Sequence, residues 1–168
     1  GYVNCGLELA QQLQHQQLSF DAIVLATGSA GTQAGLLAGL ALAGLDIPVL
    51  GVTVSRSSDE QCQKVLALLH EVQDVLKQPK LHEDHVICFD QYYGSAYGDP
   101  TAQMIEAVRL AASLEGLLLD PVYSGKAFAG LLDLVRHGYF DTSGRILFLH
   151  TGGAPGLFAY SNCLSEPS

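Results

Sequence analysis

The sequence predicts an α/β fold in which a parallel sheet carries helices on both faces. Five short runs of apolar residues are continuous rather than alternating, as in strands that are buried on both sides. Segments with helical spacing separate these runs, which is the pattern of repeated strand–helix–strand units. The length of 168 residues is that of one domain.

The expected strands and helices alternate along the whole chain. A first helix is expected over residues 1–17, where apolar side chains from Val3 to Leu13 recur at helical spacing. Strands are expected at residues 21–26, 47–54, 86–89, 116–120 and 145–150. Further helices are expected at residues 36–43, 57–76, 100–114 and 126–137.

Several helix ends have sequence signals of their own. Ser57 and Glu60 have the spacing of a capping box at the start of the third helix. Asp99 and Pro100 suit the N-cap and first position of the fourth helix. After Tyr160 the chain is polar, and we expect residues 161–168 to be a frayed tail.

Composition excludes several classes of function. Lysine and arginine number 8 against 17 acidic residues, a net charge of −9, so nucleic acids and anionic membranes are poor partners. No apolar run is long enough to span a membrane. The four cysteines form no CxxC motif, and we expect free thiols in a reducing cytoplasm.

Ligands of open α/β sheets bind outside the carboxyl ends of the strands, and four loops of unusual composition follow such ends. The first, TGSAGTQAG from Thr27 to Gly35, combines glycines, hydroxyls and the start of a helix, which favours a phosphate. It matches neither GxGxxG nor a P-loop. A plain turn with small packing residues is the alternative.

Tyrosines gather in two of these loops. Tyr92, Tyr93 and Tyr97 follow the third strand, and Tyr123 follows the fourth. A phenol at such a place can stack on a flat ligand or move a proton, but it can equally well pack in the core. Both interpretations stay open from the residues alone.

Other polar residues have simpler interpretations. His150 is expected to be a hydrogen-bonded, partly buried histidine. Lys126 is expected to be an exposed lysine in a first helical turn, with a buried reactive lysine as the alternative. His82 and His85 lack a third clustered ligand, so a solvated loop is favoured over a zinc site, and we expect no metal.

Four segments in this order carry a resemblance to a known family: TGSAGTQAGLLAGL, AYGDP, LDPVYSGKAFAGL and LHTGGAPGLFAY. They resemble the D-cysteine desulfhydrase and aminocyclopropane-carboxylate deaminase family, which uses pyridoxal 5'-phosphate and has a tryptophan-synthase-β-like fold. The resemblance covers residues 1–160. It implies that these residues form the C-terminal, large-domain part of that fold, a cofactor-binding α/β domain.

The resemblance also implies roles for individual residues. Tyr97 and Tyr123 would be catalytic phenols beside substrate and cofactor. Ser124 would face the pyridine nitrogen, and Thr151 with Gly152 would line the cofactor pocket. The cofactor phosphate would be held by the first loop, that is by Thr27, Gly28, Ser29, Ala30, Gly31 and Thr32.

Ser124 favours one activity within the family. In the family that the chain resembles, the deaminases have a glutamate at this position and the desulfhydrases a threonine, to which serine is more similar. A neutral hydroxyl beside the pyridine nitrogen leaves the cofactor ring a weaker electron sink than a carboxylate does. The resemblance therefore implies conversion of D-cysteine and water to pyruvate, hydrogen sulfide and ammonia. Aminocyclopropane-carboxylate deamination is the alternative, and a nucleotide-binding oxidoreductase is disfavoured because GxGxxG is absent.

Family members are about twice this length, and their Schiff-base lysine lies in the N-terminal half. The lysines here do not match that position; they are Lys64, Lys77, Lys80 and Lys126. We therefore expect this chain to be the C-terminal half of an enzyme, inactive alone or a non-catalytic cofactor-binding module. For the complete protein, the resemblance implies a homodimer that acts on a small amino acid.

Overall fold

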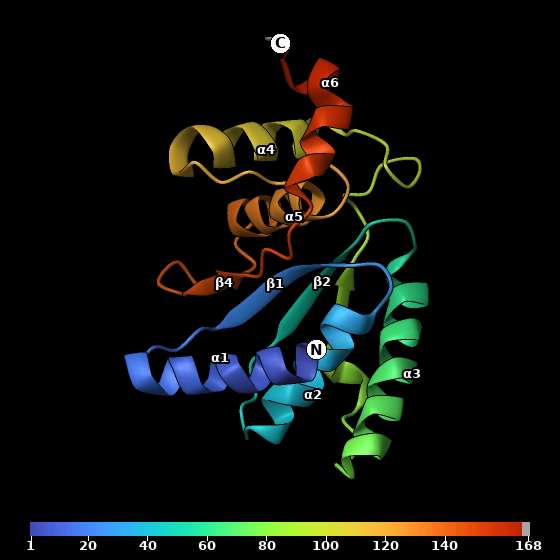
Figure 1. The fold of residues 1–168 in the computed structure, drawn as a ribbon, viewed down its shortest axis with the longest axis vertical. Helices are drawn as coiled ribbons and strands as arrows, with labels where there is room; N and C mark the ends of the chain where they lie inside the picture. The colour runs from blue at the N-terminus through green and yellow to red at the C-terminus, as the bar shows by residue number, and fades with distance from the viewer. Residues whose placement is uncertain (166–168) are drawn as a thin grey trace.

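A computed structural model describes residues 1–165 and shows a sheet between two layers of helices (Figure 1). The strands are β1 (Ala22–Thr27), β2 (Val49–Thr53), β3 (Val86–Phe89) and β4 (Ile146–Phe148). All pairings are parallel, in the order β3-β2-β1-β4. The predicted fold class and four of the predicted strands are confirmed.

The predicted strand at 116–120 is wrong, because this segment pairs with no strand of the described chain. Gly116, at φ 66°, ends the preceding helix, and the leucines that follow form an extended connection. Leu119 is buried against helix α4, whereas Leu117 and Leu118 are exposed. The apolar run thus buries one side chain against a helix instead of two faces of a sheet.

The long helices are α1 (Tyr2–Gln16), α2 (Gly31–Leu42), α3 (Ser58–Leu76), α4 (Ala102–Glu115) and α5 (Ser124–Arg136). In Figure 1, α1, α2 and α3 lie on one face of the sheet and α5 on the other, with α4 packed outside α5. Short helical segments complete the fold: η1 (Glu83–His85), η2 (Ala154–Tyr160) and α6 (Ser161–Ser165).

Helix starts confirm one sequence signal and correct two others. The Ser57 hydroxyl accepts a hydrogen bond from the Glu60 amide, so the cap of α3 is as predicted. Helix α4 is capped by Thr101, because the Asp99 carboxylate instead accepts from Ser95 in the preceding loop. Helix α2 begins at Gly31, five residues before the expected start, so half of the glycine-rich loop is helical.

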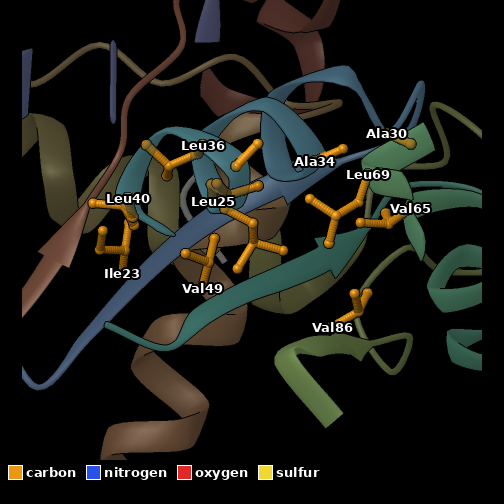
Figure 2. Packing of buried hydrophobic residues seen from close by; sticks show 12 residues of the cluster. Ile23, Leu25, Ala30, Ala34, Leu36, Leu40, Val49, Val65, Leu69 and Val86 are labelled. Atoms are coloured by element: carbon orange, nitrogen blue, oxygen red, sulfur yellow. The ribbon is translucent and has the colours of Figure 1, made fainter. Parts of the chain in front are cut away.

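On one side of the sheet, α2 packs both on β1 and against α1, and this double packing accounts for the many small residues of α2. Ile23, Leu25, Leu36 and Leu40 are buried between β1 and α2 (Figure 2). Helix α1 crosses α2 so closely that a Cβ on Gly39 would lie 2.3 Å from a carbonyl oxygen of α1. The repeated glycines and alanines of α2 let α1 approach, and the approach completes this side of the fold.

The chain end and the thiols complete the description. Part of the expected tail, Ser161–Ser165, is the helix α6, which packs on α4, and residues 166–168 lie outside the described residues. Four free cysteines are present, as predicted, with Cys88 partly buried beside the α2-face core. Among the described residues, no helix is long and apolar enough to cross a membrane.

Candidate functional site

A cavity of about 240 Å³ opens where β1 ends. Its walls come from the first loop, from the segment before α5 and from the loop after β4, so three of the four predicted loops meet there. The predicted site residues in its lining are Thr27, Gly28, Ser29, Ala30, Thr32, Tyr123, Thr151 and Gly152. The other predicted residues, Gly31, Tyr97 and Ser124, are not in it.

The start of α2 forms one wall and has the features of an anion site. No side chain caps this helix, and its N-cap residue Ala30 is held in the left-handed region at φ 77°. The uncapped amides and the positive end of the helix dipole suit a phosphate. Ser29 and Thr32 add hydroxyls to the same wall. These groups fit the phosphate of pyridoxal 5'-phosphate.

The start of α5 forms the opposite wall, and the buried Asp120 organises it. Its carboxylate accepts hydrogen bonds from the amides of Val122, Tyr123 and Ser124, at 2.8 to 2.9 Å. It also accepts from the Ser124 hydroxyl at 2.7 Å. One buried carboxylate therefore fixes the backbone that carries Tyr123.

Ser124 is buried, and its hydroxyl makes both of its hydrogen bonds with Asp120. The hydroxyl accepts from the Asp120 amide at 2.8 Å and donates to the Asp120 carboxylate. Asp120, and not Ser124, lines the cavity. The predicted contact of Ser124 with a pyridine nitrogen stays a prediction. To donate to that nitrogen, the hydroxyl would have to give up its hydrogen bond to the Asp120 carboxylate.

Tyr97 and Tyr123 form a hydrogen-bonded pair of phenols. Their oxygens are 3.1 Å apart and their rings meet edge to face, with centroids 6.0 Å apart. The hydrogen bond with Tyr97, partial burial and the Asp120 carboxylate raise the pKa of Tyr123 to about 12. Tyr123 therefore keeps its proton at neutral pH, as an unperturbed phenol also would, and it is a weaker acid than one.

The loop of residues 90–101 that carries Tyr97 is held from three sides. Ser95 donates to Asp99 within the loop, and the Tyr160 hydroxyl donates to the Gly98 carbonyl at 2.7 Å. Lys126 donates to the Tyr93 carbonyl at 2.6 Å. These bonds place Tyr97 beside Tyr123 although 26 residues separate them.

Lys126 corrects an expectation, because it is completely buried rather than exposed. Desolvation lowers its pKa, while Asp99 and Asp120 act in the opposite direction. The side chain of this first-turn lysine extends from α5 under the 90–101 loop instead of into solvent.

The remaining predicted residues are now placed. Tyr92 is a core residue whose hydroxyl donates to Asp133 at 2.7 Å, so packing is the right interpretation for it. His150 is hydrogen-bonded through both ring nitrogens, as expected, but it is exposed rather than partly buried. His82 pairs with Asp84, and residues 1–165 contain no group of three potential metal ligands.

Sequence reasoning missed five residues at or beside the cavity, one of which is Ala26 at the end of β1. Tyr2, Asp120 and Gly153 line the cavity, and Arg56 lies beside it. Asp120 had a usable signal, an aspartate between an apolar run and a helix, which is typical of a cap. Gly153 also had a signal, because it follows Thr151 and Gly152 in the same glycine-rich loop. Tyr2 and Arg56 come from separate elements and have no local pattern.

Comparison with known proteins finds relatives of this chain. A model of the family "Pyridoxal-phosphate dependent enzyme" matches residues 1–152. D-cysteine desulfhydrases of Salmonella newport and Salmonella typhimurium are 49% identical over 160 residues, which is 95% of this chain and 48% of theirs. The chain thus spans about half the length of the curated relatives it matches.

Solved structures agree with this fold. The crystal structure of an ACC deaminase homologue superposes with a TM-score of 0.82 at 36% identity, over 95% of this chain and 48% of that one. A threonine deaminase from T.th. shares the fold at a TM-score of 0.55 and 19% identity, covering 91% of this chain and 55% of its own.

Proposed function

Because the chain belongs to the family of pyridoxal-phosphate-dependent enzymes, we propose that its cavity holds that cofactor for the breakdown of D-cysteine. The observation that carries this proposal is that one cavity is lined both by the uncapped start of α2 and by the protonated phenol of Tyr123. The products of this reaction would be pyruvate, hydrogen sulfide and ammonia. The 49% identity to D-cysteine desulfhydrases supports this choice of substrate.

In the proposed site, the first loop binds and the phenols act on protons. The amides at the start of α2, with Ser29 and Thr32, would hold the cofactor phosphate. Bound pyridoxal phosphate supplies the electron sink that makes the α-proton of an amino acid acidic. Tyr123, kept protonated beside Tyr97 and fixed by Asp120, would hold or deliver a proton at its Oη.

Residues 1–160 would then form one cofactor-binding domain of a longer enzyme. None of the four lysines lines the cavity at the start of α2, so the covalent attachment of the cofactor would come from outside this chain. We therefore propose that the chain alone binds the cofactor weakly and does not turn over D-cysteine. We further propose that the complete protein is a cytoplasmic homodimer.

Deamination of aminocyclopropane-carboxylate is the second candidate, favoured by the superposition on an ACC deaminase homologue. The hydroxyl at position 124 argues for the first candidate, because it stabilises charge on a pyridine nitrogen less than a carboxylate does. In the complete protein, Ser124→Glu should accelerate ring opening and slow sulfide release if this position sets the electron sink.

The test is to assay the complete gene product, loaded with pyridoxal phosphate, on D-cysteine, L-cysteine and aminocyclopropane-carboxylate. Sulfide and pyruvate from D-cysteine, with little from the other two, are expected. Faster ring opening than sulfide release would overturn the choice of substrate. The same assays on the chain alone should show no turnover, and analytical ultracentrifugation of the complete protein should give a dimer.

A further inference from the structure

A second cavity of about 270 Å³ adjoins the first across the turn of Gly28 and Ser29. Both phenols, Tyr97 and Tyr123, open onto it, so it borders the proposed reaction site. Apart from Ser29, its remaining polar side chains come from the turn between β2 and α3 and from α3 itself. They are Ser55, Arg56 and Lys64.

The two cations of this cavity converge on one atom. Arg56 Nη1 donates to the Gly28 carbonyl oxygen at 3.3 Å, and Lys64 Nζ donates to the same oxygen at 3.2 Å. Within residues 1–165, neither cation forms an ion pair with a carboxylate. The chain has only eight lysines and arginines, and two of them are held here without a counter-ion.

A neutral carbonyl oxygen is a poor match for two positive charges. Each cation keeps unused N–H donors, and the two repel each other across a few ångströms. An anion that enters the cavity would relieve this repulsion and accept charge-assisted hydrogen bonds. The hydroxyls of Ser29 and Ser55 are additional donors around the same space, whereas the Tyr97 hydroxyl already donates to Tyr123.

We propose that Arg56 and Lys64 form a binding site for the carboxylate of a small organic acid at the mouth of the reaction site. The arginine fork suits a planar carboxylate, and the cavity has room for a molecule of three or four carbons. Two sources share this chemistry, an amino acid that enters and a keto acid that leaves. The proposal rests on the proposed function only for those two identities.

Calorimetric titration of the chain with pyruvate and with D-cysteine, in phosphate-free buffer without cofactor, tests the site. Saturable binding is expected, and Arg56→Gln and Lys64→Gln should each raise Kd about tenfold, the usual effect of losing a hydrogen bond to a charged group. Lys80→Gln removes the same charge in the loop beyond the C-terminal end of α3 and should leave Kd within about twofold, since distant surface charges are screened.

Cysteamine has the thiol and amine of D-cysteine without its carboxylate, and it should not compete. Binding of either acid that depends on Arg56 and Lys64 supports the proposal and identifies the source. Absence of saturable binding, or equal Kd values in both variants and the intact chain, would overturn it. Because no turnover is measured, this result is independent of the sulfide assay that tests the proposed function.

Discussion

Two helices begin at the edge of the same cavity, and they begin in opposite ways. At the start of α5 the Asp120 carboxylate accepts from the amide of Ser124, the first residue of the helix, and from the two amides before it. The next amide, that of Gly125, donates to the Asp120 carbonyl, so this helix start is satisfied from within the chain although its N-cap residue Tyr123 has no capping side chain. Helix α2 starts after the left-handed Ala30, with no side chain as a cap. The first amides of α2 are unpaired and free for a ligand. The amides at the start of α5 are bonded to Asp120 and hold Tyr123 in place.

The difference separates positioning from binding at one site. A capped start gives a rigid backbone and a fixed side chain, at the cost of any capacity to bind an anion. An uncapped start gives up roughly 1 kcal/mol of helix stability and retains that capacity. Each of the following substitutions changes one of these features: the Asp120 cap of α5, the uncapped start of α2, or the side chain of Tyr97 that pairs with Tyr123.

The largest effect is expected from Asp120→Ala, which deprives α5 of its cap. The carboxylate accepts four hydrogen bonds at a position that is 4% exposed, so the variant leaves buried donors unpaired. We expect the free energy of unfolding to fall by about 3 kcal/mol in a urea titration. Asp120→Asn retains one acceptor oxygen and should lose less, and a loss below about 1 kcal/mol in the alanine variant would refute the cap.

Thr32→Asp gives α2 the acidic first turn that it lacks. The added carboxylate should stabilise the helix by about 0.3–1 kcal/mol, yet it should repel a phosphate and weaken pyridoxal phosphate binding by about tenfold or more. Urea unfolding measures the first effect and a fluorescence titration with the cofactor the second. Thr32→Asn, of similar size and no charge, is the control; unchanged affinity in the aspartate variant would place the phosphate elsewhere.

Tyr97→Phe tests how far the hydrogen bond from Tyr97 raises the pKa of Tyr123. The Tyr97 hydroxyl is the first cause of the raised pKa of Tyr123, about 12, so the variant should bring that pKa closer to the ordinary value near 10. Alkaline titration of phenolate absorbance measures it, with Tyr123→Phe to assign the signal. No change in this titration would show that the pair is not coupled.

The same pair predicts a pH dependence of stability. Because folding raises the pKa of Tyr123, its contribution is fully present below pH 10 and is lost as pH rises toward 12. In Tyr97→Phe the folded-state pKa of Tyr123 should be lower, so the pH range over which this stability is lost should be narrower. Urea unfolding at several alkaline pH values would detect the change.

Sequence patterns predicted the parts of the molecule that depend on local order. Continuous apolar runs identified the four parallel strands, and the loops after them identified most of the cavity lining, since ligand sites of parallel sheets form at those ends. The run at 116–120 failed because its leucines have a strand-like composition, while only a ladder partner makes a strand, and Leu119 packs on α4 instead.

The rest of the site depends on contacts between distant segments. Lys126 has the pattern of a surface residue, but the 90–101 loop folds over it, and no local signal reports that. Arg56 and Lys64 reach Gly28 from 28 and 36 residues away. Such convergence depends on the tertiary fold, so a linear pattern cannot contain it.

The smallest effect is expected from Ala30→Gly, at the residue that keeps α2 uncapped. A left-handed alanine costs roughly 1–2 kcal/mol, and glycine removes this strain while adding about 0.5–1 kcal/mol of chain entropy to the unfolded state. Unfolding in urea should therefore show a net gain near 0.5 kcal/mol. Cofactor affinity should change little, because the amides of α2 remain. A clear loss of stability would mean that the buried Ala30 methyl contributes more through packing than its backbone loses through strain.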